Sequence, residues 1–194
     1  MSIRIVKYPH PVLRYTSKPI RRVDVELRKI AEQMLDLMYE AEGVGLAANQ
    51  INLPLRIFVA NPAGKRGEGE EFIFINPELQ LPKGSEVDRE GCLSLPGLYG
   101  DVRRSKQIQI SAYDLQGNSI ERQLDGFLAR IVQHEYDHLE GKFFFDRMTD
   151  DQRSEIEVGL DELESEFRGQ QSTGAMLPND QLVEALAEWE KRYA

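Results

Sequence analysis

The sequence predicts a mixed α+β domain that contains β-hairpins and has additional helices at its C-terminal end. Pairs of short segments rich in β-branched and aromatic residues, separated by turn-forming residues, are typical of hairpins. Longer segments repeat apolar residues at the three- and four-residue spacing of amphipathic helices. The 194 residues suit one domain with a small appendage. We expect residues 1–167 to form the domain, and residues 168–194 to form a polar linker and an amphipathic helix.

One helix and one hairpin are predicted in the first half of the chain. Asp24 can act as the N-cap of a helix that runs to about Ala41. One face of this helix is apolar and consists of Leu27, Ile30, Met34, Leu37 and Ala41. Residues 55–60 and 72–76 predict two strands, and the charged, glycine-rich residues 61–71 between them predict a hairpin loop.

A second hairpin, with strands at residues 108–113 and 119–124, is predicted to lead into another helix. Asp125 can cap this helix, and Gly141 lies where a glycine in the left-handed conformation commonly ends one. Residues 150–167 then predict an acidic helix.

A last helix is predicted after Asn179 or Asp180, either of which can cap it. The apolar face of this helix consists of Leu182, Leu186, Trp189 and Tyr193. That face can pack against the same chain or against a second copy of the chain. The sequence therefore leaves both a monomer and a homodimer open.

Composition limits the class of protein. The formal net charge of −9 argues against a nucleic-acid-binding surface, so we expect no direct nucleic-acid binding. The single cysteine cannot form an intramolecular disulfide, which fits a reducing compartment. No segment has the apolar length of a signal peptide or a membrane span. We expect a cytoplasmic protein of the bacterial type, or an organellar one if a transit peptide has been removed, and no contact with a membrane.

The most informative motif is His134-Glu135-Tyr136-Asp137-His138, which uses two of the three histidines in the chain. Side chains four positions apart on a helix lie on one face, roughly 5–6 Å apart at Cβ, so two imidazoles can bind one metal ion. Glu135 projects beside them and can exchange a proton with a water molecule on that ion. The motif therefore predicts a catalytic metal site.

Catalytic sites of this type usually have a third protein ligand, and three residues are candidates. Glu157 lies in the acidic helix, as in thermolysin-like endopeptidases. His10 lies between two prolines, which is typical of a turn or surface histidine, although it could complete a non-catalytic metal site. Cys92 stands in the unusual segment Glu90-Gly91-Cys92-Leu93-Ser94.

Two further segments complete a pattern with the histidine motif. Residues 43–50 read Gly-Val-Gly-Leu-Ala-Ala-Asn-Gln and match neither common phosphate-binding loop. In order, residues 43–50, 90–94 and 133–138 match G-x-G-x-A-A-x-Q, E-G-C-x-S and Q-H-E-x-D-H, and this resembles the peptide deformylase family. The resemblance covers about residues 1–167, and residues 95–104 look closer to the chloroplast and cyanobacterial branch of the family.

The resemblance implies antiparallel strands packed around a central helix that carries the metal ligands. It implies Cys92, His134 and His138 as ligands of one divalent ion, Fe(II) in the first place, with zinc, nickel or cobalt as possible replacements. The implied substrate is the N-formyl-methionyl end of a nascent chain at the ribosome. Glu135 would transfer the proton. The Gln50 side-chain amide and the Leu93 backbone N–H would stabilise the oxyanion.

Residues around these motifs are candidates for holding the substrate. The backbone at Val44, Gly45 and Gly91 is suited to pairing with an extended peptide. Phe127 and Ile131 lie on the same helical stripe as the two histidines and can form the wall of a pocket for the methionine side chain. Glu90 and Arg104 can pair to brace the segment that carries Cys92.

Overall fold

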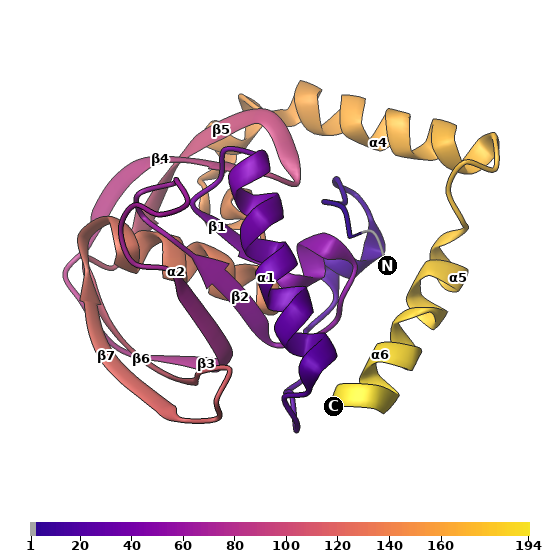
Figure 1. Cartoon of the computed structure of the whole chain (residues 1–194). Coiled ribbons are helices and arrows are strands. Elements are labelled where there is room, and N and C mark those ends of the chain that lie inside the picture. The colour runs from indigo at the N-terminus through magenta and orange to yellow at the C-terminus, as the bar shows by residue number, and fades with distance from the viewer. Residues whose placement is uncertain (1–2) are drawn as a thin grey trace.

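The computed structural model describes residues 3–194 and confirms the α+β class. One antiparallel sheet has the strand order β1 (Gly45–Ala47), β2 (Ile57–Ala60), β3 (Phe72–Lys83), β6 (Gln107–Tyr113) and β7 (Ser119–Asp125). A separate hairpin pairs β4 (Glu86–Cys92) with β5 (Leu95–Arg104). These strands surround helix α2 (Gly126–Leu139), as Figure 1 shows.

Helix α1 (Val25–Glu40) confirms the prediction made for the first half of the chain. The Asp24 carboxylate caps it by accepting a hydrogen bond of 2.9 Å from the Leu27 backbone N–H. Its buried face packs in one apolar cluster with β1, β2 and the short helix η2 (Ala48–Ile51). This packing fixes residues 43–50, which connect α1 to the sheet.

Helix α2 is the central helix, because it packs against β1, β2, β6 and β7. Ala129, Val132 and Leu139 share an apolar cluster with Phe58 and Phe74 of the sheet. The helix ends as predicted, since Gly141 has φ +69° and its N–H donates to the His138 carbonyl oxygen. The histidine motif therefore lies in the last turns of a helix held by the core.

Three strands, β1, β4 and β5, were missed by the sequence prediction, and β3 was predicted too short. β3 continues to Lys83, beyond the predicted end at residue 76. β4 and β5 were not predicted because most of their side chains are polar or half-exposed, and β5 contains Pro96 and two glycines. Such a hairpin lacks the run of apolar residues that indicates a strand in sequence.

The C-terminal segment differs from its prediction in its helix boundaries and in one cap, because Pro178, and neither Asn179 nor Asp180, occupies the N-cap position of α5. The acidic region forms two helices, α3 (Asp150–Ser154) and α4 (Glu157–Ser172), so residues 168–172 are helical and the linker predicted there was wrong. The last helix is divided at Ala185 into α5 (Asn179–Glu184) and α6 (Leu186–Tyr193).

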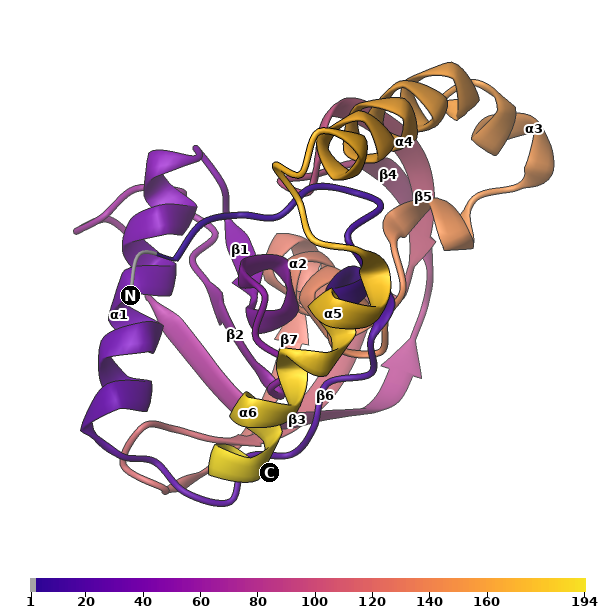
Figure 2. The same ribbon diagram turned by 90° about the vertical axis from the view of Figure 1, so that its right-hand side faces the viewer.

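The apolar face of these last helices packs on the same chain. Tyr193 is 1% exposed in the α1 cluster, and its hydroxyl donates to the Asp24 carboxylate at 3.0 Å. The arm formed by α4, α5 and α6 passes along the N-terminal segment back to α1, as Figure 2 shows. Between residues 3 and 194 there is no helix with the length and apolar character of a membrane span.

His10 lies at a turn, as one half of its prediction stated, but it is buried, so the other half, a surface histidine, was wrong. It is 3% exposed and precedes the short helix η1 (Pro11–Arg14). Its Nδ1 accepts a hydrogen bond of 3.3 Å from the Val12 N–H. Its ring lies edge-on to Phe167 of α4. Packing against the C-terminal arm, which local sequence does not reveal, buries the imidazole.

Candidate active site

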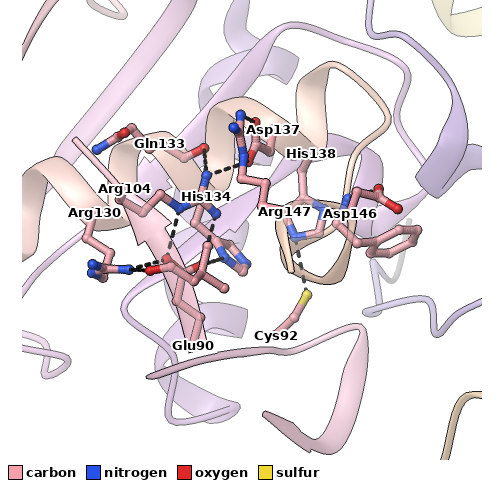
Figure 3. A network of polar contacts seen from close by, with 12 residues as sticks. Glu90, Cys92, Arg104, Arg130, Gln133, His134, Asp137, His138, Asp146 and Arg147 are labelled. Carbon is pink, nitrogen blue, oxygen red and sulfur yellow. Dashed lines mark hydrogen bonds and ion pairs between the residues drawn. The ribbon is translucent and has the colours of Figure 1, made fainter. Parts of the chain in front are cut away.

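Three side chains meet where the end of β4 approaches α2. The ligand atoms of Cys92, His134 and His138 all lie within 4.8 Å of one another, and the Cys92 Sγ is 3.2 Å from the His138 Nε2 (Figure 3). Among residues 3–194 no other group of three or more such side chains could hold a metal ion. Neither Glu157 nor His10 belongs to this group, so neither alternative ligand is supported.

Glu90 connects the hairpin to the histidine helix. One of its carboxylate oxygens lies 2.9 Å from the His134 Nδ1, and the Arg104 guanidinium donates to both oxygens at 2.9 Å (Figure 3). Burial alone would raise the pKa of Glu90, but hydrogen bonds from Arg104 and His134 outweigh it and hold this pKa well below its usual range. The carboxylate orients the His134 ring and leaves Nε2 directed at the ligand group.

The protonation of the two histidines indicates that this group favours a cation. Burial lowers the pKa of His134, but hydrogen bonds with Cys92 and Glu90 outweigh it and raise that pKa to about 10. A raised pKa means that His134 favours a positive charge beside Cys92, and a bound metal ion supplies such a charge while displacing the proton. Burial and the neighbouring charge on His134 lower the pKa of His138 well below its usual value. A thiolate and two imidazoles so arranged fit a divalent metal.

Arg130 and Asp137 belong to the same network and were missed by sequence reasoning. Arg130 donates to Glu90 Oε1 at 2.7 Å, and to the carbonyl oxygens of Val102 at 3.0 Å and Glu86 at 3.2 Å. It thus ties α2 to both strands of the hairpin. Asp137 accepts hydrogen bonds from Arg104 and Arg147 (Figure 3). The signal for Arg130 was its spacing, four positions before His134 on the same helical face.

Glu135 lies beside the ligand group and is buried. It is 4% exposed, and its Oε2 has no hydrogen-bond partner among residues 3–194. Burial raises its pKa to about 7, against the opposing charges of His134 and Arg104. Gly45 lets the carboxylate approach the backbone, because a Cβ at this position would lie 2.4 Å from the Glu135 Oε1. A buried carboxyl that titrates near neutral pH can both accept and donate a proton.

Gln50 is held so that its amide N–H₂ group faces Cys92. Its Oε1 accepts a hydrogen bond of 2.8 Å from the Ala47 N–H. Its Nε2 lies 3.5 Å from the Cys92 Sγ and 3.3 Å from the Ser94 Oγ. The side chain is 1% exposed, so it is not a surface amide of a loop.

A cavity of about 580 Å³ opens next to these groups. Eleven residues were assigned from sequence to metal binding, catalysis or substrate binding, and of these only the fully buried His138 is absent from the lining. The ten that line the cavity are Val44, Gly45, Gln50, Gly91, Cys92, Leu93, Phe127, Ile131, His134 and Glu135. Phe127 is 54% exposed, whereas Ile131 is buried. A second cavity, of about 640 Å³, lies between the N-terminal segment and the C-terminal arm and contains none of the three motifs.

Comparison with known proteins gives one consistent result. The sequence profile of the polypeptide deformylase family matches residues 2–154. A peptide deformylase of Rhodopirellula baltica is 51% identical over 193 residues, which cover 100% of this chain and 96% of that protein. The chloroplastic peptide deformylase 1B of Oryza sativa subsp. japonica is 42% identical, over 91% of this chain and 65% of that protein.

Solved structures agree with these relatives. The crystal structure of a plant peptide deformylase is 41% identical and superposes with a TM-score of 0.86, over 90% of this chain and 94% of that one. A Plasmodium falciparum peptide deformylase is 40% identical with a TM-score of 0.83, over 86% of this chain and 98% of that one. The family implies a divalent metal ion, and the Cys92, His134 and His138 group is its candidate site. The chain belongs to the peptide deformylase family, whose members remove the formyl group from the N-terminus of newly made polypeptides.

Proposed function

We propose that Cys92, His134 and His138 hold the metal ion of this deformylase and that Glu135 carries the proton through the reaction. The observation that carries the proposal is the convergence of three ligand atoms within 4.8 Å, next to a buried carboxylate oxygen that has no partner in the described chain. A bound divalent ion supplies Lewis-acid polarisation and lowers the pKa of a water molecule that it coordinates.

We infer that Fe(II) is the native ion. The family resemblance supports iron, and the donor set supports a metal softer than magnesium or calcium, because one ligand is a thiolate and two are imidazoles. Zinc, nickel and cobalt suit the same donors, so each of them is expected to bind when supplied. The Cys92 thiolate is also the group through which oxygen would inactivate an iron form.

Glu135 is suited to accept and then donate the same proton. With a pKa of about 7, its carboxyl exists in both forms near neutral pH. It takes a proton from the attacking water as the new C–O bond forms at the formyl carbon. It then gives that proton to the amine nitrogen as the C–N bond breaks, so the products are formate and a free N-terminus.

Gln50 and Leu93 are proposed to stabilise the negative charge that develops on the formyl oxygen. The Ala47 N–H fixes the Gln50 carbonyl oxygen, which leaves the amide N–H₂ as the group that faces the cavity. The Leu93 backbone N–H follows directly after the ligand Cys92 and would be a second donor. Donors fixed in advance act mainly in the transition state, and losing one typically costs about 3 kcal/mol in the barrier.

The cavity is proposed to bind the formyl-methionyl end of an extended chain. Val44, Gly45 and Gly91 line it and would pair with the peptide backbone, while Phe127 and Ile131 would contact the methionine side chain. One chain supplies every residue of the proposed site, so a monomer would be active, and a homodimer is not required. Nascent chains at the ribosome are the proposed partners, in a bacterial cytoplasm or in an organelle that starts translation with formyl-methionine.

Removal of the thiolate tests the ligand assignment. Cys92→Ala is expected to lose the metal and formate release together, because two histidines alone bind divalent ions far more weakly than three ligands. The measurements are metal content after reconstitution with Ni(II), formate release from a formyl-Met tripeptide, and far-UV circular dichroism for the fold. Full metal occupancy in a folded Cys92→Ala variant would overturn the assignment.

A further inference from the structure

Helix α4 reaches the wall of the substrate cavity, although it lies outside the part of the chain that matches the family profile. The profile ends at residue 154, and α4 spans Glu157–Ser172. The helix packs against β5, as Figures 1 and 2 both show. At Gly159 of the helix, a Cβ would lie 2.4 Å from the Leu98 Cδ2. The absence of a side chain at this position lets the helix approach Leu98 in its present rotamer.

Leu98 has one side toward the cavity and one toward α4. It belongs to the cavity lining, in the segment formed by residues 95–99. It also packs in an apolar cluster with the buried residues Ile156 and Leu160 and the partly buried Leu163. The neighbouring Gly97 has φ +78° and nothing within 4 Å of the position of a Cβ, so it gives the segment no packing of its own. Leu98 is therefore the side chain through which α4 can hold this part of the wall.

We propose that Leu98 is a specificity-determining residue of the substrate cavity and that Gly159 is the positioning residue that sets where Leu98 lies. The inference rests on the proposed use of the cavity for the formylated peptide. It assigns a role to the first turn of α4, which the three motifs do not explain.

A methyl group at Gly159 should shift Leu98 and leave the chemistry intact. The atom it meets is the far end of a leucine side chain, which can change its rotamer without breaking the fold. The displaced end lies at the cavity wall, and Leu98 is none of the proposed ligand, proton-transfer or oxyanion residues. Peptide binding should weaken while metal content and the chemical step are unchanged. We expect KM for a formyl-Met tripeptide to rise about fivefold in Gly159→Ala, with kcat within about twofold of the parent.

The same helix offers a matched control. Gly169 also lies within α4, and nothing is within 4 Å of the position of its Cβ. Alanine at either position improves helix propensity equally, so both variants should unfold at a slightly higher temperature than the parent, unless the contact with Leu98 offsets the gain. Only Gly159→Ala should change KM.

A double-mutant cycle shows whether the effect passes through Leu98. The variants are Gly159→Ala, Leu98→Ala, the double variant and Gly169→Ala, each compared as a metal-loaded enzyme of equal metal content. With Leu98 truncated the added methyl group has nothing to displace, so Gly159→Ala should leave KM unchanged in the Leu98→Ala background.

Three outcomes would overturn the inference. They are an unchanged KM in Gly159→Ala, the same rise in both backgrounds, and an equal rise in Gly169→Ala. A failure of the parent enzyme to release formate would instead refute the proposed function. The two failures are therefore distinguishable.

Discussion

The two regions that supply the metal ligands are built in opposite ways. Helix α2 is surrounded by the sheet, and His138 is fully buried within it. Strand β4 carries Cys92 at the end of a charged hairpin, and Glu90 is the one buried residue of that strand. Core packing fixes the helix and part of β5, whereas strand β4 is held to both by ion pairs of Glu90 with Arg104 and Arg130. The metal site thus joins α2, which the apolar core holds, to β4, which buried charges hold.

The largest effect is expected from breaking that charged connection at Glu90. Glu90→Gln leaves two buried guanidinium groups without their shared carboxylate, so we expect a loss of about 3–5 kcal/mol in the free energy of unfolding. The measurement is urea denaturation followed by circular dichroism. Asp88→Asn, on the exposed part of the same strand, is the control and should stay within about 0.5 kcal/mol of the parent. Equal stability of the two variants would mean that Glu90 does not hold the hairpin.

The pH dependence of stability distinguishes the contribution of His10, which packs against the C-terminal arm, from that of Glu90 in the hairpin. Burial, and to a smaller extent the charge of Arg4, lower the pKa of His10 to about 4 from an unfolded value near 6.5. The native state then binds fewer protons than the unfolded state between these values, so stability falls as pH falls from about 6.5 to 4. For Glu90, whose native pKa is lowered, the corresponding loss begins only below its unfolded value of about 4.5.

We therefore expect the parent to lose about 2 kcal/mol more than His10→Asn between pH 7 and pH 5. Asparagine can still cap η1 but does not titrate. The measurement is urea unfolding of both proteins at the two pH values, and the difference between them cancels acid effects on the metal site. Parallel pH profiles for the two proteins would show that His10 is not buried in its neutral form.

A smaller effect, on metal affinity, is expected from removing the guanidinium group of Arg130. Arg130→Met keeps the apolar stem of the side chain and removes its hydrogen bonds to Glu90, Val102 and Glu86, while Arg104 still holds Glu90. Metal affinity should fall about tenfold, as is common when an outer partner of a ligand is lost. The measurement is competition for Ni(II) with a chelator. Arg103→Met, on an exposed position of β5, is the control, and an equal loss in both variants would contradict a specific role for Arg130.

The comparison also explains how much could be predicted from sequence. α1 and α2 were predicted because a buried face gives a regular apolar period, and because Asp24 marks the start of α1 and Gly141 the end of α2. Asp125 precedes α2 as predicted, but its side chain makes no capping hydrogen bond. The hairpin was not predicted, because charged side chains that pair with one another do not repeat in a way that identifies a strand. Cys92 was assigned through resemblance to a family, because a single cysteine belongs to no repeating sequence pattern that would identify it as a ligand.

The remaining differences have the same physical origin. The burial of His10 depends on contacts between the two ends of the chain, such as its contact with Phe167 of α4. Such contacts lie more than a hundred residues apart in sequence, so local patterns do not report them. Arg130 was missed because, from sequence alone, an arginine on a helix is expected to be solvated. Its partners lie on the β4–β5 hairpin, whose position next to α2 the sequence does not show.

The central claim is that the hairpin and the helix together hold the ion while Glu135 performs proton transfer. The most direct test is kcat of Glu135→Gln for a formyl-Met tripeptide, with metal content measured in the same sample. Glutamine has the shape of glutamate but cannot serve as the base, so we predict full metal occupancy and a decrease in kcat of about 10²- to 10⁴-fold. A fully metal-loaded Glu135→Gln variant that turns over at a rate close to the parent would contradict the claim.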